Sequence, residues 1–172
     1  MICPPNTRPL AVTLAAALAA VVIAAGPASA LSCLAPSVAF TYGYAADSPA
    51  NYVVAVGSLQ ATGPSNPPQG AVAEGGDINQ MAGYTQAAQF SGMAFTGEAY
   101  TSPLTTRIVA DVTCVAAWCG SYADEANALF FFRRDADGTH VLEINACPGN
   151  VFANPTPAQL QQVTQCYNSG DC

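Results

Sequence analysis

The residues of this sequence best suited to chemistry are its cysteines. The 172-residue chain has seven cysteines and a single histidine. Cys3 lies in the N-terminal leader described below, and the other six are Cys33, Cys114, Cys119, Cys147, Cys166 and Cys172. An even number in an exported chain predicts disulfides, because thiols outside the cytosol meet oxidising conditions. A metal site would need Cys-x-x-Cys pairs or neighbouring histidines, which are missing, and the residues alone leave the pairing of the cysteines open.

His140 is the one candidate for a general base or a metal ligand. It follows a turn, and strand alternation places it on one face with Leu142 and Ile144, which is typical of a residue at the rim of a barrel. A catalytic base also needs a positioned nucleophile, and the sequence has neither a Gly-x-Ser-x-Gly elbow nor a His-Glu-x-x-His helix. We therefore expect no enzyme and no catalytic residue.

Two groups of acidic residues have simple structural interpretations. The adjacent pair Asp124 and Glu125 is typical of a solvated loop rather than of catalytic carboxylates. The segment Asp135-Ala-Asp-Gly138 resembles part of a calcium loop, but its glycine comes too early for an EF-hand. A hairpin turn explains it better, because Asp-Gly between two apolar runs is a strong turn signal.

The first 30 residues have the pattern of a signal peptide. Arg8 supplies a positive charge, residues 10–25 form an apolar run, and Ala28-Ser29-Ala30 is a small-x-small cleavage site. The run is short for a membrane span, and no later segment is long and apolar enough for one. We expect residues 1–30 to be removed, which leaves one secreted or periplasmic domain of 142 residues, 31–172.

The charge of the remaining chain excludes several kinds of partner. It has no lysine, and only Arg107, Arg133 and Arg134 oppose eleven acidic residues, which gives a net charge of −8. Nucleic acids and anionic membranes bind proteins through lysine and arginine. We expect neither as a partner, and we expect Arg133 and Arg134 to pair with nearby acids.

The apolar pattern predicts a helix, five strands and a second helix. The expected elements are a helix over Pro36–Ala46, strands over Tyr52–Leu59, Tyr84–Tyr100, Thr105–Val115, Leu129–Arg134 and Thr139–Ala146, and a helix over Thr156–Gln165. A phase slip at Ser91-Gly92 predicts a glycine bulge that bends the second strand. This order fits an all-β fold with flanking helices, a disulfide-linked, five-stranded Greek-key barrel of the OB type.

Phe130-Phe131-Phe132 could form a ligand surface, because alternation along a strand sends neighbouring side chains to opposite faces. The more ordinary interpretation is that the three rings fill the core on both sides of the sheet, partly beneath a helix. Residues 61–77 have the composition of a long loop, rich in proline and glycine.

Several features in order resemble the netrin-like (NTR) module, whose best-known members are the tissue inhibitors of metalloproteinases. They are Cys33-Leu-Ala-Pro36, Ala39-Phe40, Val53-Val54, Cys119-Gly120, Leu129–Phe132, Asp137-Gly138, Leu142, Ile144, Cys147, Val151–Pro155 and Cys166. The resemblance spans nearly the whole chain after residue 30. It implies a non-enzymatic extracellular binding module without a cofactor of its own, whose partner is a metalloprotease or another extracellular protein.

The resemblance also implies a disulfide pairing and a binding edge. Cys33 is similar to the second cysteine of the inhibitors' Cys-x-Cys start, and its implied partner is Cys147. The two remaining pairs would then be local, Cys114–Cys119 and Cys166–Cys172. The implied edge contains Leu31, Ser32, Cys33 and Leu34 together with Pro64, Pro67 and Pro68 of the loop between the first two long strands.

The sequence departs from the family at the residue that chelates zinc in the target protease. In the inhibitors the free amine and carbonyl of the first cysteine bind that zinc, but Leu31 stands in its place here. Cleavage after Ser32 instead of Ala30 would make Cys33 the terminal residue, and a weak lipobox, Ala30-Leu-Ser-Cys33, makes lipidation of Cys33 a third alternative. A structural or adhesive protein of the cell envelope is the second functional hypothesis, and an exported hydrolase using His140 is the third.

Overall fold

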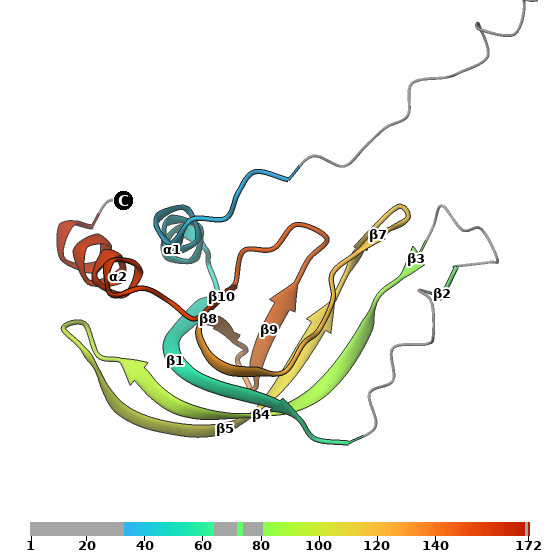
Figure 1. Cartoon of the computed structure of the whole chain (residues 1–172), viewed down its shortest axis with the longest axis horizontal. Coiled ribbons are helices and arrows are strands. Elements are labelled where there is room, and N and C mark those ends of the chain that lie inside the picture. The colour runs from blue at the N-terminus through green and yellow to red at the C-terminus, as the bar shows by residue number, and fades with distance from the viewer. Residues whose placement is uncertain (1–32, 64–71, 74–80, 171) are drawn as a thin grey trace, which may run out of the picture. The chain divides into compact units, whose positions relative to one another are not determined.

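The computed structural model describes residues 33–63, 72–73, 81–170 and 172. Five strands form a closed circuit of hydrogen bonds: β1 (Asn51–Ala61), β4 (Tyr84–Phe95), β5 (Tyr100–Val112), β9 (His140–Ile144) and β8 (Glu125–Arg134). Strand β8 pairs with β1 and so completes the circuit, and β9 runs parallel to β5 while the other neighbours are antiparallel. A short strand, β10 (Val151–Ala153), adds to β8 (Figure 1). The fold is therefore mostly β-sheet.

Two helices flank the strands, close to where the sequence predicts them (Figure 1). Helix α1 (Val38–Asp47) begins after Ser37, whose hydroxyl accepts a hydrogen bond from the Phe40 amide. Helix α2 (Pro157–Ser169) has a capping box, in which the side chains of Thr156 and Gln159 each accept from the other's backbone amide. In the described part of the chain no helix is long and apolar enough to cross a membrane.

The boundary between the second and third long strands differs from the prediction. The chain turns at residues 96–99, where the Thr96 amide donates to the Ala99 carbonyl and Gly97 has a φ of 99°. The segment expected to be one strand, 84–100, therefore ends at Phe95, and the next strand begins at Tyr100 rather than at Thr105. A glycine in the left-handed region allows this tight turn between Phe95 and Tyr100.

The bulge expected at Ser91-Gly92 is also absent, because the β4–β5 register runs without a break from Tyr84 to Ala94. Gly92 instead lies directly opposite Gly57 of β1. A Cβ on Gly92 would lie 2.2 Å from the Val56 carbonyl oxygen and 2.7 Å from the Gly57 Cα. The two glycines thus let two strands approach more closely than any other residue pair would allow.

Two apolar clusters share strand β8 between them. Phe130 and Phe132 lie inside the circuit of strands, with ring centroids 5.2 Å apart, and both rings pack against Phe90. Phe131 points to the other face and packs with Phe152 and Val163 beneath the helices. All three consecutive phenylalanines are fully buried, which confirms the interpretation that they fill the core on both sides of the sheet.

Three disulfides join the six cysteines: Cys33–Cys147, Cys114–Cys119 and Cys166–Cys172. These are the same pairs that the family resemblance implied. The second bond links two very short strands, β6 (Cys114–Val115) and β7 (Trp118–Cys119), which follow β5 directly. Another two-stranded pair, β2 (Val72–Ala73) with β3 (Met81–Ala82), precedes β4. The expected third strand, 105–115, is thus divided between β5 and β6.

Candidate functional site

The part of the expected binding edge that the structure describes begins at Cys33. The Cys33–Cys147 disulfide, with the two Cα atoms 5.4 Å apart, ties this segment to the chain that follows β9. The side chain of Leu34 is 87% exposed. The other residues of the expected edge lie outside the described residues. They are Leu31 and Ser32, which precede Cys33, and Pro64, Pro67 and Pro68 of the loop.

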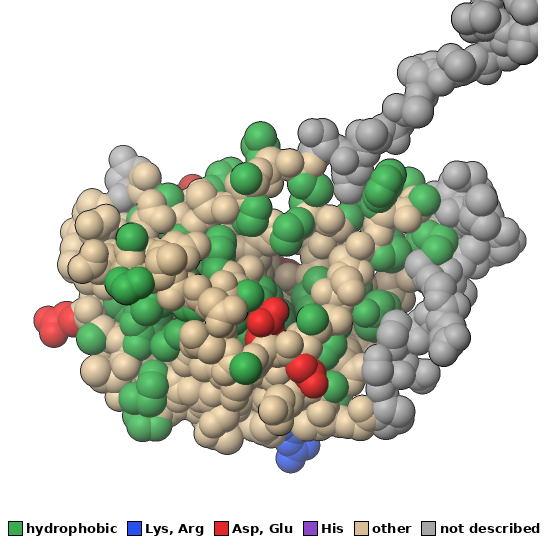
Figure 2. Space-filling view, in the orientation of Figure 1, with side chains coloured by type: hydrophobic (Ala, Val, Ile, Leu, Met, Phe, Trp, Pro, Cys, Tyr) green, Lys and Arg blue, Asp and Glu red, His purple; other side chains and the backbone are tan. Residues whose placement is uncertain are grey.

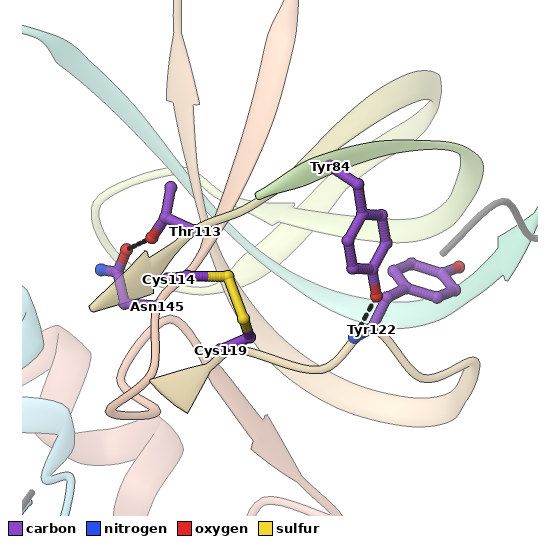
Figure 3. Close-up of a disulfide and its surroundings, with 6 residues drawn as sticks. All are labelled: Tyr84, Thr113, Cys114, Cys119, Tyr122 and Asn145. Atoms are coloured by element: carbon purple, nitrogen blue, oxygen red, sulfur yellow. Dashed lines mark hydrogen bonds between the residues drawn. A yellow bond between two sulfur atoms is a disulfide. The ribbon is translucent and has the colours of Figure 1, made fainter. Parts of the chain in front are cut away.

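A second exposed segment is the hairpin of β6 and β7, closed by the Cys114–Cys119 disulfide (Figure 3). Its tip exposes two apolar side chains that face each other across the strands, Val115 (57% exposed) and Trp118 (50% exposed). Ala116 in the turn has a φ of 54°, in the left-handed region. The amide of Met81 donates to the Ala116 carbonyl, so the tip is bound to the chain before β4. We call residues 114–119 the disulfide hairpin.

The base of the disulfide hairpin is joined closely to the end of β9. The hydroxyl of Thr113 donates to the side-chain oxygen of Asn145 over 2.7 Å (Figure 3). The Gly120 amide donates to the Thr113 carbonyl, and a Cβ on Gly120 would lie 2.3 Å from the Ile144 carbonyl oxygen. The hairpin is therefore fixed by a disulfide, by hydrogen bonds and by a close backbone contact that requires glycine.

A third contact in the same region involves two tyrosines. The Tyr84 hydroxyl accepts a long hydrogen bond of 3.5 Å from the Tyr122 amide (Figure 3). The Tyr122 hydroxyl donates to Asp124, and this bond together with burial raises the pKa of Tyr122, burial being the larger cause. Asp124 also accepts from the Ala61 amide over 2.7 Å, so this carboxylate fixes the end of β1 to the chain before β8.

Between the disulfide hairpin and the Cys33–Cys147 disulfide lies a cavity of about 330 Å³. Its walls come from β8, β9 and the two segments that carry the disulfides, residues 119–123 and 146–151. Cys119 lines it on one side, and Ala146 and Pro148, the neighbours of Cys147, line it on another. A hollow is visible in the surface shown in Figure 2, with acidic side chains nearby. The cavity thus lies beside Cys119 of the disulfide hairpin and beside the neighbours of Cys147, the disulfide partner of Cys33.

The cavity exists because β8 and β9 separate soon after they meet. Only Arg133 and Arg134 of β8 have register partners on β9. Beyond that point the Asn150 side chain donates to the Glu143 carbonyl and bridges part of the gap. Glu143 also lines the cavity, and its carboxylate is already engaged: it pairs with Arg133, 3.1 Å from the Arg133 Nε, and accepts a hydrogen bond from the Tyr52 hydroxyl. Arg133 also pairs with Asp135 at 3.0 Å, as expected for one of the few arginines.

His140 and the Asp-Gly segment lie at the other end of β9. The half-buried His140 is opposite Arg134, and burial, then the arginine charge, lower the pKa of the imidazole. Residues 135–138 form the expected turn, in which the Gly138 amide donates to the Asp135 carbonyl. Thr139 donates to the Asp137 carboxylate and lowers its pKa. In the described chain, no three histidine, cysteine or acidic residues are grouped as metal ligands would be.

The sequence pattern predicts neither the exposed pair of Val115 and Trp118 nor the cavity. The available signal for the hairpin was the only tryptophan of the chain, placed between two cysteines five residues apart. The sequence predicts that Glu125 is a solvated loop residue, but in the structure it begins β8 and lines the cavity. Comparisons of this chain with protein-family models, with curated proteins and with solved structures found no match.

Proposed function

We propose that this protein is an exported, non-catalytic module that binds another protein through the Cys33–Leu34 segment and the disulfide hairpin. In this proposal residues 1–30 are a cleaved signal peptide, and residues 31–172 form an OB-type Greek-key barrel of the netrin-like kind. The circuit β1-β4-β5-β9-β8, with its single parallel pair between β5 and β9, supports this barrel type. The three disulfides favour an extracytoplasmic location, where such bonds persist.

The observation that carries the proposal is that two exposed apolar side chains, Leu34 and Trp118, are each fixed beside a disulfide. Leu34 and Trp118 each lie within one residue of a disulfide-bonded cysteine, and both side chains are at least half exposed. A partner that buried them would gain apolar contact area, and tryptophan is among the residues that dominate binding energy at interfaces. Because disulfides already fix the backbone, binding would cost little additional ordering.

The resemblance to metalloproteinase inhibitors adds a specific mechanism that depends on where the leader is cut. A chain that begins at Cys33 presents a free amine and a carbonyl at the edge, and these two groups could chelate the zinc of a target protease. A chain that begins at Leu31 lacks the terminal cysteine and would bind its partner without chelating zinc. The intact mass and N-terminal sequence of the exported protein decide between these starts.

The test is inhibition of purified zinc endopeptidases by protein whose first residue is Cys33. We expect inhibition that is abolished by acetylating the terminal amine and weakened at least tenfold by Trp118→Ala. Val115→Ala should weaken it less, and Val109→Ala is its matched control, because Val109 is also partly exposed but lies on β5. Absence of inhibition across the panel would reject the inhibitor mechanism and would favour the alternative, a structural or adhesive protein of the envelope.

A further inference from the structure

The cavity between β8 and β9 carries a carboxylate that its neighbours do not neutralise. Among the described residues Glu125 has no ion pair or hydrogen-bonded partner for its side chain, whereas Glu143 is paired with Arg133. None of the described residues that line the cavity is basic. With three arginines and no lysine after residue 30, the chain has few cations to offer this carboxylate.

A bulge in β8 turns Glu125 toward the cavity. Gly57 pairs with Ala128, and Leu59 pairs with Glu125. Strand β1 therefore advances by two residues where β8 advances by three. The extra residue reverses the alternation of side chains along β8. Glu125 consequently lies opposite Leu59, which is 1% exposed and belongs to the interior cluster, and directly opposed residues of two strands share a face.

The floor of the cavity is apolar. Leu59, Phe130 and Leu142 line it, and all three are buried side chains of the interior cluster. A volume of about 330 Å³ is at the lower end for ligand pockets, which suits one long side chain or a small molecule. An apolar floor below the unpaired, half-buried carboxylate of Glu125 is complementary to a flexible alkyl chain that ends in a cation.

We propose that this cavity receives a lysine or arginine side chain of the partner protein, with its alkyl part on the apolar floor and its cationic group at the Glu125 carboxylate. The inference rests on the proposed function, since it supplies the chemistry by which the partner would be recognised between the two disulfide-bonded segments. The acidity of the whole chain would add to the attraction between the two proteins, because a net charge of −8 attracts basic surfaces.

A small cation tests the cavity without the partner. The exported protein, labelled with ¹⁵N, is titrated with butylammonium chloride and separately with butanol at constant ionic strength. We expect saturable shifts of the Gly120, Ser121 and Asn145 amides with butylammonium, and binding about fivefold weaker for butanol, the size expected of a half-exposed ion pair. Glu125→Gln should reduce the affinity for butylammonium to that for butanol.

The matched control is Glu98→Gln, which removes the same charge from an exposed glutamate at the β4–β5 turn and should leave binding unchanged. The thermal midpoint of each variant shows that it is folded. Equal affinities for butanol and butylammonium, an unchanged affinity in Glu125→Gln, or no saturable shift would each overturn the inference. Protease inhibition without cation binding would reject this inference alone, and cation binding without inhibition would reject only the inhibitor function.

Discussion

The two sides of the closed circuit of strands are stabilised by different interactions. On one side, which we call the ladder side, β4 pairs with β5 through twelve register positions and with β1 through seven. On the other, the gap side, β8 and β9 share two register positions and then separate around the cavity. There the Cys33–Cys147 and Cys114–Cys119 disulfides and two side-chain hydrogen bonds connect the chain instead. Where strand pairing ends, covalent links take its place, and the exposed apolar side chains lie beside them.

The largest loss of stability should come from removing the Cys33–Cys147 disulfide, which lies on the gap side. The Cys33–Cys147 bond closes a loop with a sequence separation of 114, so Cys33→Ser with Cys147→Ser should lower the free energy of unfolding by about 4–5 kcal/mol. The same change at Cys114 and Cys119, separated by five residues, should cost about 2 kcal/mol. Urea unfolding of both double variants measures this, and equal losses would contradict the loop-length argument.

The second-largest effect on stability should come from the aromatic core, where Phe132 of β8 packs against Phe90 of β4. Phe132 is fully buried, and its ring centroid lies 5.1 Å from that of Phe90 and 5.2 Å from that of Phe130. Phe132→Ala would leave a void between strands that cannot close, so we expect a loss of about 3–5 kcal/mol in unfolding free energy. Phe40→Ala is the control, because Phe40 is 72% exposed. A loss below about 1 kcal/mol for Phe132→Ala would show that the circuit of strands can collapse around the void.

A smaller effect should follow from adding a methyl group to the β1–β4 ladder. In Gly92→Ala the new Cβ would meet only backbone on its closest side, at Val56 and Gly57, so the strands would have to move apart. We expect a loss of about 1–3 kcal/mol. Gly43→Ala is the matched control, because nothing lies within 4 Å of a Cβ there and alanine favours the helix. Thermal unfolding should thus show opposite signs for the two variants, and a stabilising Gly92→Ala would refute the close approach.

The smallest effect should be a pH dependence from His140, where the two sides of the circuit meet. Its pKa in the folded protein is below the ordinary 6.5, so the unfolded chain binds more protons in this window. Stability should therefore fall as the pH drops from 6.5 through the folded pKa, with no further loss from this group below it. His140→Gln should flatten that part of the profile of unfolding free energy against pH, and parallel profiles for the two proteins would contradict the prediction.

The sequence predicted the buried faces of the strands better than their boundaries and register, for physical reasons. Alternation places Ile108, Ala110 and Val112 on one buried face, and the structure buries all three. The turn near Gly97 falls inside the predicted strand, although the polar residues Thr96 and Glu98 flank the glycine, because a strand with one buried face also contains polar residues at short intervals. The inward position of Glu125 depends on a bulge, which is a property of register between distant strands that local alternation does not encode.

The candidate site was predictable only in part. The order of cysteines and the family resemblance indicated Cys33 and Leu34, and the exposure of Leu34 is what a contact residue needs. The position of the disulfide hairpin in the candidate site depends on contacts that residues 113 and 120 make at the end of β9. The contacted residues, 144 and 145, are more than twenty positions away in the sequence. Such contacts have no local pattern, and three-dimensional placement alone reveals them.

The position of Trp118 has a practical consequence for optical measurements. It is the only tryptophan of the chain, and its indole is half exposed at the tip of the disulfide hairpin. Excitation at the red edge of the absorption band, where tyrosine does not absorb, therefore selects a single fluorophore at one known place. Its emission maximum and its accessibility to quenchers would report the environment of that tip alone, in the unlabelled natural protein and in real time.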